Sequence, residues 1–173
     1  MILRLSQKLS TKIGAGTLQS LPRDENPYAD WSAHVFTADR TQYILLSNTK
    51  SLYSTVMYGQ GITEGSRFIE RALSCIREFM EDDGQQFVYA RFIAPASATV
   101  RFAKALNRSV TGSMSDLINH ATAWLASGEL SPHDTSFKLN AVLLSALGAA
   151  NTRPYGKPRD AFKALARSGV PGP

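Results

Sequence analysis

The fold is constrained most strongly by the segment WSAHVFTADRTQYILLSNTKSLYSTVMYG, which spans residues 31–59. Trp31, Ala33 and Val35 occupy every second position at its start, and this two-residue period is that of a β-strand with one buried face. The sequences ADRT and NTK divide the segment into three apolar runs, and both have the composition of turns. Because short turns join neighbouring antiparallel strands, we predict an antiparallel meander over residues 31–59.

Apolar residues at three- and four-residue spacings predict helices that pack on this sheet. The clearest helix covers 66–84 and ends at Gly84, a residue suited to a helix end. Further helices are expected at 6–14, 85–94, 113–128 and 157–169, strands at 1–5 and 97–105, and either a strand or a helix at 136–147. We therefore expect a single domain over residues 1–173, of the α+β class. It should have an antiparallel sheet, helices on one face, and a flexible end from about residue 168.

The composition is that of a globular and slightly basic protein. Of its 173 residues, 43% are hydrophobic and 19% are charged, which argues against disorder. The net charge of +5 fits weak attraction to a phosphate-bearing partner, and it fits solubility alone equally well. The one cysteine, Cys75, allows no intramolecular disulfide. The sequence has neither a signal-peptide core nor an apolar window long enough to span a membrane, so we expect a bacterial cytoplasmic protein without membrane contact.

The best candidate site is a polar junction at residues 104–116, between a predicted strand and a predicted helix. The first turn of a helix presents unpaired N–H groups and partial positive charge, which favours an anion. Six residues are candidate ligand contacts: Lys104, Asn107, Arg108, Ser109, Gly112 and Ser113.

A structural interpretation competes with the anion site. Ser113 and Asp116 stand three apart, as in a variant capping box, so Ser113 and Gly112 are explained as a helix start without any ligand. This interpretation leaves Lys104, Asn107, Arg108 and Ser109 unexplained, and Arg108 is either a ligand contact or half of a structural ion pair.

Other chemistry is indicated only weakly. His120, about two turns beyond Ser113, and His34, on the strand face opposite Trp31, are the candidates for a catalytic base. No histidine stands at metal-ligand spacing from another histidine or the cysteine, so we expect no metal and no cofactor. The aromatic residues on or beside the meander are more typical of packing than of nucleic-acid binding; they are Tyr28, Trp31, Phe36, Tyr43, Tyr53 and Tyr58.

Three segments together resemble an uncharacterised family of small bacterial domains of unknown function. They are DWSAH at 30–34, YILLSNTKSLYS at 43–54 and NRSVTGSMSDL at 107–117, and the likeness covers most of residues 1–140. The late signature of that family reads Asn-Arg-Ser-Val-x-Gly-Ser-Met-x-Asp, and Ser115 stands here where the family usually has Asn. The resemblance implies a cytoplasmic α+β domain and no particular activity, and it marks the junction as a shared feature.

Three functions remain open from the sequence. The first is a binding module that holds an anionic partner, either nucleic acid or another phosphate-bearing ligand, at the 104–116 junction. The second is a small hydrolase or transferase with a histidine base near that junction. The third is a protein-interaction domain, such as an adaptor, an antitoxin-like partner or a homodimer.

Overall fold

The computed structural model describes residues 1–148 and 154–167, so the expected flexible end from about residue 168 lies outside the described residues. Its centre is a five-stranded sheet in the order β4-β3-β2-β1-β5. The strands are β1 (Ile2–Leu5), β2 (Asp30–Ala38), β3 (Thr41–Asn48), β4 (Ser54–Tyr58) and β5 (Arg101–Lys104). Strands β2, β3 and β4 form the predicted antiparallel meander. The α+β class is therefore confirmed.

The sheet as a whole is mixed, which corrects the prediction of an antiparallel sheet. Strand β1 pairs in parallel with β2 on one side and with β5 on the other. The reason is connectivity: β1 is followed by a helix and a long loop before β2, and such a crossover returns the chain in the same direction, whereas a tight turn reverses it.

The first turn of the meander contains an unusual residue pair. Ala38 pairs with Thr41, so only Asp39 and Arg40 form the loop, with φ values of 43° and 64°. Two successive positive φ values define the hairpin turn whose twist matches its strands. Asp at the first position tolerates this conformation well, which explains why a turn forms here without glycine.

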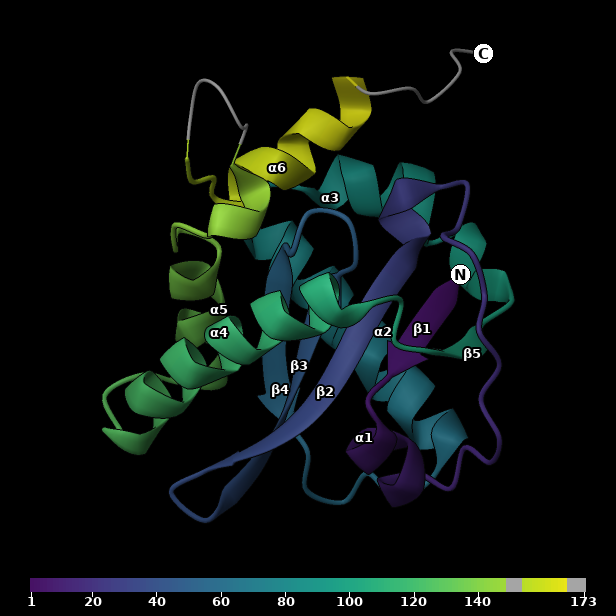
Figure 1. The fold of residues 1–173 in the computed structure, drawn as a ribbon, viewed down its shortest axis with the longest axis horizontal. Coiled ribbons are helices and arrows are strands. Elements are labelled where there is room, and N and C mark those ends of the chain that lie inside the picture. Colours follow the sequence, from purple (N-terminus) through teal and green to yellow (C-terminus); the bar gives the residue numbers. More distant parts are fainter. Residues whose placement is uncertain (149–153, 168–173) are drawn as a thin grey trace.

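Helices cover both faces of the sheet, which corrects the prediction of helices on one face. The helices are α1 (Gln7–Lys12), α2 (Gly65–Asp82), α3 (Gln86–Val88), α4 (Arg108–Ala126), α5 (Pro132–Leu139) and α6 (Pro158–Ala164). Short 3₁₀ turns cover Pro27–Ala29, Ala96–Ala98, Ser145–Leu147 and Leu165–Arg167, and a π-helical turn covers Tyr89–Ile93. Figure 1 shows α4 on one side of the sheet and α2 on the other.

The two faces carry separate hydrophobic cores. Trp31, Ala33 and Val35 of β2 pack in one core with α1, α2 and Phe162 of α6. Phe36, of opposite parity on the same strand, packs in the other core with α4. The continuous apolar run of β3 signals this burial on both faces, because a strand with one wet face alternates instead.

Helix α5 covers the β4 edge of the sheet. The Asn140 side chain, just beyond α5, accepts a hydrogen bond from Ser54 N at 2.8 Å and donates one to Ser54 O at 2.7 Å. The hydroxyl of Ser136 accepts a bond from Val56 N at 2.9 Å. These side chains take the place of a sixth strand at Ser54 and Val56, whose outward backbone groups therefore have partners without pairing to another chain.

A buried ion pair fixes the loop between α1 and β2. Arg4 is 1% exposed, and its guanidinium donates to both carboxylate oxygens of Asp30, at 2.8 and 2.7 Å. It also donates to the carbonyls of Leu21 and Pro22. Lys104 N donates to Gln19 O at 2.9 Å, so the same loop is held along β5. The loop thereby forms a fixed wall beside the end of β5.

Candidate functional site

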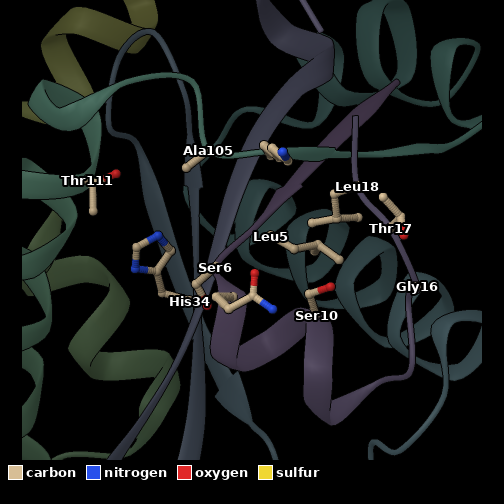
Figure 2. A pocket seen from close by; sticks show the side chains of 11 residues that line it. Leu5, Ser6, Ser10, Gly16, Thr17, Leu18, His34, Ala105 and Thr111 are labelled. Carbon is tan, nitrogen blue, oxygen red and sulfur yellow. The ribbon is translucent and has the colours of Figure 1, made fainter. Parts of the chain in front are cut away.

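A cavity lies at the carboxyl ends of the parallel strands β1 and β5 and has a volume of about 550 Å³. Its lining comes from four parts of the chain: the β1–α1 junction, the fixed loop, β2 and the β5–α4 junction (Figure 2). The lining residues are Leu5, Ser6, Gln7, Ser10, Gly16, Thr17, Leu18, His34, Lys104, Ala105 and Thr111.

The connectivity of the sheet creates this cavity. Helix α1, which follows β1, packs through Leu9 and Ile13 on the same face as α2. Helix α4, which follows the neighbouring strand β5, packs through Met114 and Leu117 on the opposite face. Where the helices after two adjacent parallel strands diverge in this way, a crevice opens at the carboxyl ends of the strands, and ligands of α/β sheets bind in such crevices.

Helix α4 begins earlier than the sequence predicts. Its N-cap is Asn107, whose side-chain oxygen accepts a hydrogen bond from Val110 N at 3.0 Å. Ser113 is not the cap: it is buried inside the helix, and its hydroxyl donates to Ser109 O at 3.1 Å. The capping box expected from Ser113 and Asp116 is therefore wrong. Asn is as good a cap as Ser, so the spacing alone does not choose between them.

The structure brings some of the predicted site residues together and separates others. Lys104 lines the cavity, as does Thr111 on the first turns of α4. Arg108, Ser109 and Gly112 are exposed on α4 and do not line it. Within residues 1–148 and 154–167, Arg108 forms no salt bridge and no side-chain hydrogen bond, which argues against the structural ion pair considered for it.

Of the two histidine candidates, only His34 belongs to the cavity. It is half-buried, it lies on the face opposite Trp31 as expected, and burial lowers the pKa of its imidazole below the ordinary value. The imidazole is therefore neutral at physiological pH. His120 is exposed and stacks on Trp124, with ring centroids 5.5 Å apart, farther along α4.

The cavity offers polar groups whose bonding capacity is unused. Among the described residues, the side chains of five lining residues have no hydrogen-bond partner within the protein: Gln7, Ser10, Thr17, His34 and Lys104. Ser10 is only 4% exposed, yet its hydroxyl still reaches the cavity. No Asp or Glu occurs among the described lining residues, so none of them neutralises the ammonium charge of Lys104 there. Such a set of groups suits an anion.

Sequence reasoning missed three of these groups. Gln7 and Ser10 lie in the short helix after β1, and Thr17 lies in the loop that the Arg4–Asp30 pair fixes. The signal was available in part, because a helix was expected from residue 6, and Ser6 caps it by accepting a hydrogen bond from Leu9 N. What the sequence does not reveal is that β1 and β5 are neighbours, which brings the two junctions to one edge of the sheet.

Other candidate chemistry finds a structural explanation. Cys75 is half-buried beside Thr55, and desolvation raises the pKa of its thiol to about 11, so it stays protonated. His133 pairs with Asp82 on the surface at 3.0 Å. No group of three potential metal ligands occurs in the part of the chain that the structure describes. Of the six aromatic residues considered for nucleic acid, all are buried except Tyr58, which is 50% exposed.

Comparison with protein families extends this picture. The model of one family, described as a domain of unknown function (DUF6933), matches residues 2–161. The chain belongs to this family. The expected resemblance to a family of unknown function is thus confirmed, and DUF6933 covers the whole sheet, the cavity and most of α6. No curated protein and no solved structure matches the chain.

Among the described helices, none combines the length and the apolarity that crossing a membrane requires.

Proposed function

We propose that this DUF6933 protein binds a small anionic molecule in the cavity at the carboxyl ends of β1 and β5. One observation carries the proposal: an ammonium group, an imidazole, an amide and two hydroxyls line a single cavity, and among the described residues they have no hydrogen-bond partner and no carboxylate beside them in the lining. Its volume of about 550 Å³ lies in the range of small-molecule sites, roughly 300–1,000 Å³.

The residues that line the cavity differ in part from the ligand contacts expected from the sequence. Lys104 stays as the principal cation, while His34, Gln7 and Ser10 join it from other elements. Asn107 and Ser113 are occupied in α4 by their own hydrogen bonds, and Arg108, Ser109 and Gly112 stand on the outer surface of that helix. A phosphate-bearing small molecule fits a cavity of this size better than a polymeric nucleic acid, which needs a basic stripe along the surface.

Equilibrium binding of inorganic phosphate and sulfate tests the proposal. Hydrogen bonds to charged groups contribute about 1.5–3 kcal/mol, so Lys104→Met should weaken binding about tenfold or more. Arg108→Met is the matched control, because it removes the same charge four residues later at a position outside the cavity. The proposal fails if the two variants lose affinity equally, or if neither anion binds the unaltered protein.

A small hydrolase or transferase is the second candidate, and the neutral imidazole of His34 favours it. Such a group can accept a proton from a water or hydroxyl that attacks a bound ester. Hydrolysis of aryl phosphates and aryl esters, measured with and without His34→Gln, would reveal this activity. Equal rates in both proteins would remove His34 as its base.

A further inference from the structure

We propose that His34 is the second cationic contact of the bound anion, and that the imidazole takes up one proton as the anion enters the cavity. The inference rests on the proposed function and deepens it, because it names a proton as the co-ligand of the anion. Its basis is the position of His34 in one cavity with Lys104 and the absence of any carboxylate from that lining.

Without an anion, none of the described residues stabilises an imidazolium at His34. The side chain has no hydrogen-bond partner in the described part of the protein, and burial disfavours its charged form. Thr111 also lines the cavity, but its hydroxyl already donates a proton to Asn107 O. His34 therefore stands neutral, with both ring nitrogens available to the cavity.

The charged and titratable groups on the surrounding elements are mostly basic. They are Lys8 and Lys12 on α1, Arg4 on β1, Arg23, Asp24 and Glu25 in the fixed loop, Tyr43 on β3, Arg101 and Lys104 on β5, and Arg108, Asp116 and His120 on α4. Arg4 is neutralised by Asp30, and Asp24, Glu25 and Asp116 lie outside the cavity lining. Among the described lining residues, no anionic side chain thus takes the place of a ligand beside His34.

A bound anion favours the protonated form of His34 over the neutral one. An opposite charge within about 4–6 Å favours the charged form of a titratable group, and it acts strongly in a partly buried site. The anion would thus raise the pKa of the imidazole, and a proton from water would bind His34. The protonated ring then donates a charge-assisted hydrogen bond to the anion, as Lys104 does from the end of β5.

The linkage has a definite sign. Because the occupied cavity holds one more proton than the empty one, the affinity must rise as the pH falls between the two pKa values. The slope approaches about tenfold per pH unit for one proton, and it disappears above the upper pKa and below the lower one.

The test uses sulfate, whose own charge does not change between pH 5.5 and 8. The dissociation constant is measured across this range for the unaltered protein, for His34→Gln and for His120→Gln, and the His34 ring signals are followed by NMR. We expect affinity to fall with rising pH in the unaltered protein and in His120→Gln, a flat profile in His34→Gln, and an upward shift of the His34 titration with sulfate.

A flat profile in the unaltered protein, or an unchanged slope in His34→Gln, would overturn the inference. In both of these cases the proposed function survives if binding still depends on Lys104. Absence of sulfate binding at every pH would instead overturn the inference and the proposed function together. Chemical-shift dispersion of each variant shows whether it is folded, so a misfolded variant is not mistaken for either result.

Discussion

At the scale of single residues, the start of α4 shows what sequence spacing does and does not determine. Two polar residues, Asn107 and Ser113, each precede a plausible helix, and the structure uses the first as the cap. The choice depends on Val110 and Met114, which pack on the second core and therefore need helical geometry from Arg108 onward. Local propensity alone does not contain that information.

This assignment predicts unequal effects of alanine at the two positions. Asn107→Ala should reduce the free energy of unfolding by about 1 kcal/mol, because it removes the N-cap hydrogen bond to Val110 N. Ser113→Ala should reduce the free energy of unfolding by less. Alanine is the better helix former, and the lost hydroxyl donates only to Ser109 O, a carbonyl that already has a partner in the helix backbone. Urea denaturation of both variants measures the difference, and a larger loss at Ser113 would restore it as the cap.

The buried pair of Arg4 and Asp30 makes a second prediction at this scale. Arg4→Met should reduce the free energy of unfolding by about 3–5 kcal/mol, because it leaves the Asp30 carboxylate buried without its partner. Adding Asp30→Asn should recover part of that loss, since the amide needs no counter-charge and still accepts the bond from Asp24 N. Urea denaturation of the single and double variants checks this, and a double variant less stable than Arg4→Met would contradict it.

At the scale of elements, most helices and strands could be predicted from the sequence. Which of them lie side by side in the fold could not. The period-two runs of the meander, the Ser6 cap and the positive φ of Gly84 and Gly128 all follow local rules. Segment 136–147 was ambiguous because Phe137 and Leu139 serve different cores while Ser136 and Asn140 hydrogen-bond to β4. A helix with this division of contacts has no simple apolar stripe.

The role of α5 as a cover for the β4 edge predicts residue-specific exchange. Asn140→Ala leaves Ser54 N and O without partners, which should cost about 1–3 kcal/mol and speed amide exchange at Ser54. Ser136→Ala should instead speed amide exchange at Val56, because the Ser136 hydroxyl accepts the hydrogen bond from Val56 N. Hydrogen exchange followed by NMR separates the two variants. Unchanged protection at both amides would show that α5 does not satisfy this edge.

At the scale of the whole molecule, the position of the cavity follows from the path of the chain. The sequence indicated Lys104 and His34 separately, but their common site depends on β5 lying beside β1 although about a hundred residues separate them in the chain. The parallel pairing and the two-faced helix layers together produce the crevice. That arrangement is non-local, which explains why the junction was predicted near the site while most of the lining was missed.

The proposed function requires an anion to bind inside this cavity and not on the outer surface of α4. Amide chemical shifts of the unaltered protein, followed during a sulfate titration, distinguish the two places. We expect saturable shifts concentrated at Gln7, Ser10, Thr17, Lys104 and Thr111. Shifts concentrated at Arg108 and Ser109, or spread without saturation over the basic surface, would contradict it.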